Sequence, residues 1–190
     1  MRSLLRKRHG MLWTLVGLVL VFLGLIGIVI LLGVVIPRSH TATSRIVVPA
    51  AQQDVWNTLI DFEHHPEWRK MLEKIEQAQP IDGKPVWIEY SKFGRMPMQV
   101  DEMTEPSLLR MRIADDKLPF GGTWTFELST APDDAQRSTL QITEDGVISN
   151  PIYRVMSRFA MGYHAVMDQY LKDMATKYGA TTPKPEHVSK

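Results

Sequence analysis

The stretch SRIVVPAAQQDVWNTLIDFEHHPEW, residues 44–68, decides the fold of this chain. It opens with a run of β-branched side chains that predicts a strand, which Pro49 ends because proline lacks the N–H of a ladder hydrogen bond. The next segment, 52–62, predicts a short helix, since its large apolar residues recur at helical spacing. Those residues are Val55, Trp56, Leu59 and Ile60. Pro66 then favours a second short helix over 67–75.

Several later segments alternate apolar and polar residues with a period of two. Such alternation is typical of an antiparallel sheet with one covered face, and the Gly, Pro and Asp residues between the segments favour hairpins. The segments are 86–90, 98–101, 109–113, 123–128 and 139–143. Together with the first strand, they predict a curved sheet of about six to seven strands.

The last expected element is a long amphipathic helix over residues 151–178. Asn150 can cap it, Pro151 suits its first turn, and Gly179 can end it. Its apolar side chains form one stripe, which a sheet can wrap around. The whole order predicts an α+β fold in which a curved antiparallel sheet surrounds a long C-terminal helix, with a ligand cavity between them.

Residues 11–36 form an uninterrupted run of 26 residues without Asp, Glu, Lys, Arg or His. A helix of that length spans about 39 Å, enough to cross a hydrocarbon core of about 30 Å. The run is longer than the core of a secretory signal peptide, and it has no small-residue cleavage site. The sequence therefore predicts one N-terminal transmembrane helix.

The flanks of this run predict its orientation. Basic residues are more frequent before it than after it, which favours a cytoplasmic N-terminus and a C-terminal domain in the periplasm or outside the cell. We therefore divide the chain into consecutive parts with different roles. They are a basic cytoplasmic N-terminus (1–10), the transmembrane helix (11–36), a linker (37–43), a ligand-binding domain (44–179) and a flexible tail (180–190).

The part of the chain after residue 36 holds 18 basic and 21 acidic residues, a net charge of −3. A slightly acidic domain offers no electrostatic case for nucleic-acid binding. The chain has no cysteine, which excludes disulfides, thiolate metal sites and a cysteine nucleophile. No glycine-rich phosphate loop or Gly-x-Ser-x-Gly elbow occurs in the sequence, so no cofactor is predicted.

The opening stretch contains four short motifs. They are Val48-Pro49-Ala50, Val55-Trp56, Leu59-Ile60-Asp61-Phe62 and His65-Pro66-Glu67-Trp68. Together they resemble the START-like superfamily (SRPBCC), which includes polyketide cyclases and dehydrases and lipid-transport proteins. The segments 121–126 and 138–145 and the amphipathic last helix also look like that family. The resemblance implies a helix-grip fold over about residues 43–179 and an internal site for a hydrophobic small molecule or lipid.

Large apolar and aromatic side chains around the predicted cavity are the candidates for ligand contacts. The thioethers among them suit a pocket that adapts to apolar ligands, although methionine also fills gaps in ordinary cores. The candidates are Trp68, Tyr90, Met98, Met111, Trp124, Phe126, Met156, Phe159 and Tyr163.

Three titratable residues are candidate proton carriers. Strand parity puts Glu102 and Glu144 on the covered face, where carboxylates could orient a polar group, unless the strands end there and both face water. His164 could face the cavity from the last helix, or lie on its flank. Glu63-His64-His65 lacks the spacing of a metal site and is expected in a solvated loop, so no metal is predicted.

These observations leave three functions open. The first is membrane-anchored binding or transfer of a hydrophobic small molecule or lipid in an internal cavity. The second is an enzyme of the polyketide cyclase or dehydratase type, which the resemblance also implies. The third is a non-catalytic structural or regulatory module of the cell envelope, and no motif predicts a particular protein partner.

Overall fold

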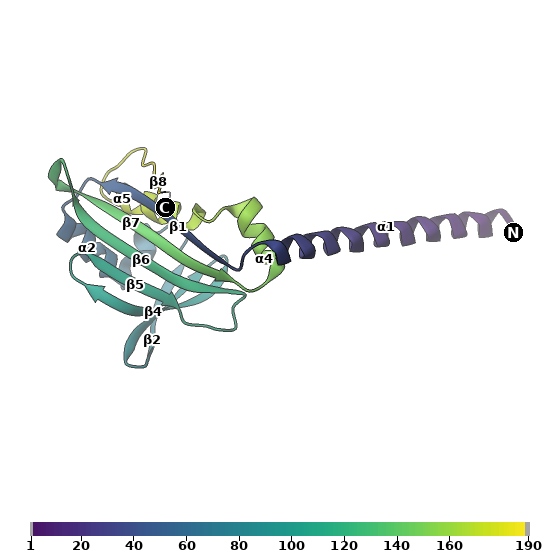
Figure 1. The fold of residues 1–190 in the computed structure, drawn as a ribbon, viewed down its shortest axis with the longest axis horizontal. Helices are drawn as coiled ribbons and strands as arrows, with labels where there is room; N and C mark the ends of the chain where they lie inside the picture. The colour runs from purple at the N-terminus through teal and green to yellow at the C-terminus, as the bar shows by residue number, and fades with distance from the viewer. Residues whose placement is uncertain (1, 189–190) are drawn as a thin grey trace.

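A curved antiparallel sheet of eight strands forms the body of the molecule (Figure 1). The computed structural model describes the backbone of residues 2–188 and the side chains of residues 13–188. Across the sheet the strands follow the order β2-β3-β4-β5-β6-β7-β1-β8. They are β1 (Ser39–Val48), β2 (Lys74–Ile81), β3 (Lys84–Ser91), β4 (Gly94–Thr104), β5 (Leu108–Ile113), β6 (Phe120–Ala131), β7 (Asp134–Ile148) and β8 (Glu186–His187). The predicted α+β class and curved sheet are confirmed, with β8 as a two-residue addition.

The first strand is longer than the sequence predicted. β1 pairs with β7 along its whole length, so the segment 37–43, expected as a linker, is strand from Ser39 onward. The hydroxyl groups of Thr43 and Thr143 hydrogen bond across the pair at 3.0 Å. A polar segment without alternating apolar residues can therefore form a strand when a neighbouring strand provides the backbone hydrogen bonds.

Short helices follow β1. They are α2 (Gln52–Ile60), η1 (Phe62–His64) and α3 (His65–Trp68). α2 confirms the predicted first helix and buries Trp56 and Leu59 completely. The prediction of a helix over 67–75 is wrong in its extent, because α3 ends at Trp68 and the chain from Lys74 onward pairs with β3. Pairing at the sheet edge outweighs local helical spacing here.

The predicted single helix over 151–178 is interrupted. Its parts are α4 (Pro151–Met156), a π-helical turn η2 (Ser157–Met161) and α5 (Ala165–Lys177). Asn150 caps α4 as predicted, since its side chain accepts the N–H of Ile152 at 2.9 Å. Gly162 ends η2 at φ +75°, a backbone conformation that glycine adopts without a Cβ clash. Of these parts, α5 supplies the side chains buried in the core, and α4 lies beside the end of the N-terminal helix α1 (Arg2–Val35) (Figure 1).

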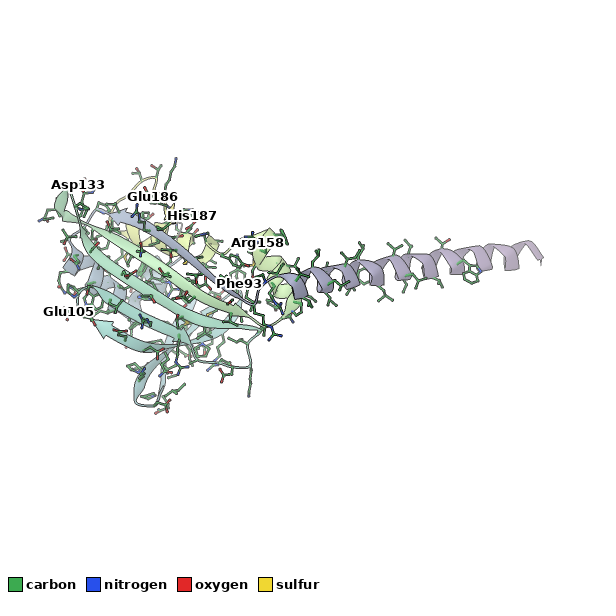
Figure 2. All side chains as sticks on the ribbon, in the orientation of Figure 1. Phe93, Glu105, Asp133, Arg158, Glu186 and His187 are labelled. Carbon is green, nitrogen blue, oxygen red and sulfur yellow. The ribbon has the colours of Figure 1, made fainter. Side chains whose placement is uncertain are left out.

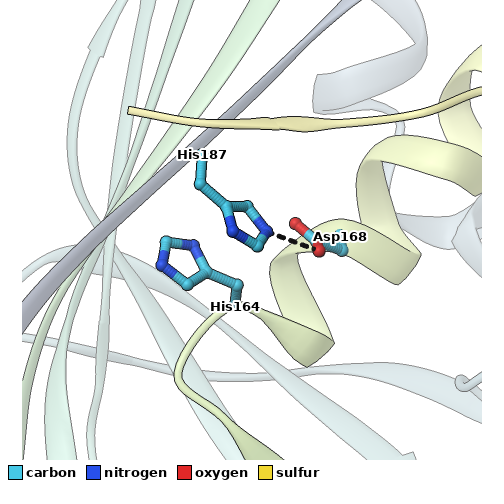
Figure 3. A group of neighbouring side chains, drawn as sticks. All are labelled: His164, Asp168 and His187. Atoms are coloured by element: carbon cyan, nitrogen blue, oxygen red, sulfur yellow. Dashed lines mark hydrogen bonds and ion pairs between the residues drawn. The ribbon is translucent and has the colours of Figure 1, made fainter. Parts of the chain in front are cut away.

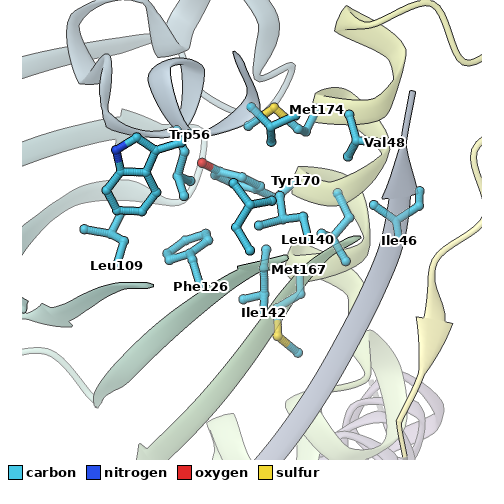
Figure 4. Close-up of a cluster of buried hydrophobic side chains, with 14 of the residues drawn as sticks. Ile46, Val48, Trp56, Leu109, Phe126, Leu140, Ile142, Met167, Tyr170 and Met174 are labelled. Atoms are coloured by element: carbon cyan, nitrogen blue, oxygen red, sulfur yellow. The ribbon is translucent and has the colours of Figure 1, made fainter. Parts of the chain in front are cut away.

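The core lies between the inner face of the sheet and the helices α2 and α5 (Figure 4). Trp56 of α2 and Met174 of α5 are fully buried there, and they meet Leu109, Leu140 and Ile142 of the sheet, which are also fully buried. The alternation that predicted β5, β6 and β7 is therefore confirmed. Burial of each large apolar side chain is worth about 1.5–3 kcal/mol, so this contact dominates the stability of the domain.

The C-terminal residues return to the edge of the sheet. β8 pairs with Ser44 and Arg45 of β1. Part of the segment 180–190, expected as a flexible tail, is therefore a strand, and residues 189–190 lie outside the described residues.

The N-terminal helix α1 is continuous and extends away from the domain (Figure 1). Within it, Trp13–Val35 is long and apolar enough to cross a membrane, and almost all of that stretch is exposed. The charges of the predicted basic segment, residues 1–10, belong to side chains outside the described part of the chain.

Candidate functional site

The inner face of the sheet is packed at one end and open at the other. Where α2 and α5 cover it, the inward side chains are buried, whereas toward the end where α1 joins they are partly exposed. We call this second region the open end. It is lined by inward residues of strands β3 to β7 and by one residue that precedes α5. These residues are Trp87, Met96, Ile113, Trp124, Glu144 and Tyr163.

The position of the open end follows from the topology. β1, β4 and β6 begin at this end of the sheet, and β5 and β7 finish there. α5 starts only at Ala165, after the chain has turned at Gly162. The helix that covers the rest of the inner face is therefore too short to cover this end.

Glu144 is the carboxyl group of the open end. It lies on β7 directly opposite Trp124 of β6, and its side chain is 23% exposed. Burial raises the pKa of Glu144 to about 7, and a hydrogen bond from Trp124 opposes that rise. At neutral pH a large share of this carboxyl is therefore protonated and can donate a hydrogen bond to a guest oxygen.

His40 completes the polar part of the site. Its ring stacks on Tyr163 with a centroid distance of 3.9 Å, and its Nε2 lies 3.9 Å from the Glu144 carboxylate. Burial lowers the pKa of His40, so burial favours the neutral form of both partners. Gly146 makes room for the imidazole, since a Cβ at that position would clash with the His40 ring. Burial therefore weakens the ion pair that the 3.9 Å separation would otherwise favour.

Several predicted ligand contacts are buried in the core. Met98, Met111 and Phe126 face inward as predicted and are buried, and Met98 and Met111 lie directly opposite Trp87 and Trp124 of the open end. Trp68 packs edge-on against Tyr170 of α5, with centroids 5.3 Å apart. The partly exposed inward side chains are thus confined to one end of the inner face.

Tyr90 is on the other face of the sheet, and its assignment to the covered face is wrong. Register pairs Trp87 with the buried Met98, so Trp87 and Glu89 point inward and Tyr90 points outward. Tyr90 lies beside Lys74, whose Nζ is 5.5 Å from its ring centroid. The segment Val86–Tyr90 is apolar on both faces near its start, so alternation alone could not choose the inward face.

Glu102 is also on the outer face, against the prediction. A β-bulge between Val100 and Glu102 inserts one extra residue, so Glu102 pairs with Arg110 and not with an inward residue of β5. Its carboxylate lies 3.0 Å from the Arg110 guanidinium, and both side chains are nearly half exposed. The bulge reverses strand parity, which no period-two pattern can anticipate.

Met156 and Phe159, which were predicted as ligand contacts, do not line the inner face. They are 45% and 72% exposed on α4 and η2. The break at Gly162 separates this segment from α5 and leaves it beside α1. The apolar residues of 151–178 therefore do not lie on one surface. Those of α5 face the sheet, and those of α4 and η2 are exposed beside α1.

Sequence reasoning missed four members of the site. Met96 lies on β4 just before the predicted strand segment 98–101 and was not selected. Trp87 and Ile113 lay in predicted strands but were not selected, and the contact between the Trp87 and Phe62 rings at 5.2 Å fixes the inward direction of Trp87. His40 lay in the expected linker. His40 could have been found only by predicting that β1 begins at residue 39 and pairs with β7 from there.

A second cluster of titratable groups lies at the sheet edge (Figure 3). The hydroxyl of Ser44 lies 3.0 Å from Nδ1 of His164 and donates to Asp168 at 2.8 Å, and Asp168 also bonds Nε2 of His187 at 2.9 Å. The two imidazole rings stack at 3.8 Å and 14°. Because imidazole lone pairs lie in the ring plane, parallel rings do not aim them at one ion.

This edge cluster fastens β8 to α5, and within it His164, a predicted candidate proton carrier, contacts Ser44 and stacks on His187. Burial lowers the pKa of His164, and the neighbouring His187 lowers it further. A neutral imidazole is suited to the stacked arrangement.

The predicted solvated loop over Glu63-His64-His65 is only partly correct. His64 is exposed, but His65 is 2% exposed and its Nε2 lies 3.1 Å from the carbonyl of Leu59. Burial lowers the pKa of His65 to about 4. A neutral His65 donates to Leu59 and accepts from Arg69 at 3.2 Å, which locks α3 onto the end of α2.

Comparison with protein families identifies this architecture. Residues 39–178 match the family described as polyketide cyclase / dehydrase and lipid transport, and the chain belongs to that family. The predicted START-like, helix-grip identity is confirmed. A comparison with curated proteins found no match.

Solved structures share the fold at low sequence identity. An aromatase/cyclase, Zhui, from a Streptomyces species superposes with a TM-score of 0.59 at 15% identity, covering 74% of this chain and 93% of that one. A START superfamily protein from Mycobacterium smegmatis gives 0.58 at 14% identity, covering 73% and 97%. A conserved protein from Geobacillus kaustophilus gives 0.59 at 13% identity, covering 78% and 100%.

Glu144→Gln is expected to change how stability depends on pH. The unfolded carboxyl loses its proton near 4.5, whereas the folded one holds it to about 7, so the wild type loses stability as pH rises between these values. The loss amounts to about 3 kcal/mol at about 1.4 kcal/mol per pKa unit, and Gln at this position does not titrate. Urea unfolding in detergent micelles across that pH range measures the difference.

The matched control is Glu102→Gln, which removes an exposed carboxylate from the outer face. It is expected to change stability by at most about 1 kcal/mol. The stability difference between wild type and Glu144→Gln should change between pH 4 and pH 8. A difference that stays constant over this range would contradict the buried position of the carboxyl.

Proposed function

We propose that the domain binds an apolar small molecule or lipid in the open end while α1 holds it at a membrane. The observation that supports this most directly is Glu144, a largely buried carboxyl group in a lining that is otherwise aromatic and apolar. A carboxyl in such a place lowers the stability of the domain, and groups of that kind gather at functional sites. Membership of a family of cyclases and lipid-transport proteins supports the same class of ligand.

The lining indicates the chemistry of the guest. Trp87, Trp124, Met96 and Tyr163 offer flat or flexible apolar surface. Neutral Glu144 can donate one hydrogen bond, which suits an oxygen acceptor. The ligand is therefore an apolar ring system or chain that carries a carbonyl or hydroxyl group, and its affinity comes mainly from buried apolar area at about 25 cal/mol per Å².

A membrane anchor explains how such a ligand reaches the site. α1 holds the domain beside the layer in which apolar molecules dissolve, which raises their effective concentration at the open end. The excess of basic residues before the apolar run supports a cytoplasmic N-terminus and a domain on the opposite side. Protease digestion of the domain in sealed vesicles of known sidedness checks that orientation.

A second candidate function is catalysis of the cyclase or dehydratase type. It is supported by the pKa of Glu144, which lies near 7, where a general acid or base works best. His40 lies beside it as a second possible proton acceptor. Glu144→Gln is then expected to keep the bound molecule and to lower turnover by about 10²-fold or more, and full turnover by this variant would exclude the role.

Trp124→Leu is expected to weaken ligand binding. The change removes an indole from the lining of the open end. The loss of about 1.5–3 kcal/mol of apolar contact corresponds to about 10- to 100-fold in affinity. Full-length protein extracted gently from its own membrane and weighed by native mass spectrometry should carry a bound species in the wild type and little in the variant.

The matched control is Tyr90→Leu, which removes an aromatic side chain from the outer face of the same sheet. It is expected to retain the bound species. Equal occupancy of the wild type and Trp124→Leu, or an empty wild type, would count against the proposal and favour a non-catalytic envelope module.

A further inference from the structure

A buried arginine fastens the last turn of α1 to α4. Arg154 is 4% exposed, and its Nη1 donates to the carbonyls of Gly33 at 2.7 Å and Ile36 at 3.0 Å. Its Nη2 donates to the carbonyl of Ser149 at 3.0 Å. Carbonyls at the C-terminus of a helix lack partners within the helix and carry partial negative charge, so a guanidinium satisfies them and stabilises this end.

The backbones of the two helices also touch. A Cβ at Gly33 would clash with the carbonyl of Pro151, so only glycine lets α4 approach this closely. Arg154 and Gly33 together make α1 and α4 one rigid joint. The place of α4 relative to the end of α1 is therefore fixed and does not depend on a linker.

The segment attached to this joint exposes an unusual amount of apolar surface. Five large apolar side chains of α4 and η2 are exposed within ten residues, and we call them the α4–η2 patch. They are Ile152 (42%), Tyr153 (42%), Met156 (45%), Phe159 (72%) and Met161 (45%). The other exposed large apolar residues of the described domain are scattered over separate strands, turns and α5. Large apolar side chains exposed together in one short segment mark an interaction site.

The level of this patch is set by α1. The apolar stretch Trp13–Val35 is about 35 Å long, slightly more than a hydrocarbon core of about 30 Å, so its last turn lies at the boundary between lipid and water. Arg154 binds the carbonyl of Gly33 in that turn and the carbonyl of Ile36, which follows the helix directly. Arg158 is exposed on the same segment beside the end of α1 (Figure 2), where a cation can meet lipid phosphates.

We propose that the α4–η2 patch lies in the interfacial layer of the bilayer that α1 crosses, so that the domain is docked on the lipid surface and not merely tethered to it. The inference rests on the membrane-spanning role proposed for α1. Aromatic and thioether side chains buried about 5–10 Å into the headgroup region gain apolar burial while the helix lies along the surface.

Docking of this kind has a consequence for the ligand site. Tyr163 of the open end follows the patch directly, and β4, β6 and β7 bring their open-end residues to the same end of the sheet. The open end is thereby held at the lipid surface. An apolar ligand can then pass between bilayer and domain without crossing bulk water.

Single-cysteine labelling tests the proposal, because the chain has no cysteine of its own. Full-length Phe159→Cys, Asp133→Cys and Leu23→Cys are labelled with an environment-sensitive fluorophore and reconstituted in phosphatidylcholine–phosphatidylglycerol vesicles with or without brominated acyl chains. Asp133 is the matched control, since its side chain is 74% exposed on the β6–β7 turn, at the end of the domain away from α1 (Figure 2). Leu23 reports on α1 itself.

The label at Phe159 should lose about half or more of its intensity with bromines near the headgroups, and less with bromines at the chain ends. The label at Asp133 should be unaffected. The label at Leu23 should be quenched most by bromines at the bilayer centre.

Other outcomes overturn the proposal in separable ways. Quenching at Leu23 without quenching at Phe159 leaves the anchor intact and rejects docking. No quenching at Leu23 rejects the anchor, and docking with it. A blue-shifted Phe159 label that bromolipids do not quench shows that the patch is covered by protein, such as a second copy of the chain.

Discussion

Coverage of the inner face of the sheet by α5 is the constraint on which the structure depends. A curved sheet with one apolar face must bury that face, and α2 and α5 bury only the part that they reach. The glycine turn at Gly162 limits α5 to 13 residues and directs the preceding segment toward α1. The same turn therefore creates the packed core, the open end and the exposed surface of α4.

The chemistry of the site follows from the side chains that α5 leaves uncovered. β6 and β7 extend beyond the N-terminal end of α5. There their inward side chains include Trp124 and Glu144 instead of aliphatic residues. Partial burial raises the pKa of the carboxyl, and a stacked imidazole lies beside it. One fold element thus accounts for an apolar lining, a carboxyl group of raised pKa and inward side chains left partly exposed at the end of the domain where α1 joins.

Much of the fold and part of the site could be predicted from the sequence, in the strands whose pairing is regular. Period-two alternation located β5, β6 and β7, placed Trp124 and Phe126 on the inner face and left Glu144 as a candidate for it, and the register puts all three side chains there. The opening motifs identified the family correctly. In both cases local pattern and tertiary structure agree, because the residues that define the pattern are also the residues that are buried.

The remaining positions depended on events that leave little trace in local patterns. A single bulge in β4 moved Glu102 to the outer face, and apolar residues on both faces of β3 hid the inward direction of Trp87. The break at Gly162 divided one apolar stripe between the sheet and α1, which is why Phe159 is exposed. His40 joined the site only through long-range pairing of β1 with β7. Parity and helical spacing describe single elements, so they fail where one residue changes the phase or the direction of the chain.

The central claim is that a guest occupies the open end and leaves the packed half undisturbed. Methyl NMR of labelled methionines in the full-length protein, embedded in a lipid nanodisc and titrated with decanol, tests it directly, since Met96 lines the open end and Met174 is fully buried under α5. The account predicts that the Met96 methyl resonance shifts in a saturable manner while that of Met174 stays in place. Shifts confined to Met174, or no saturable shift at Met96, would contradict it.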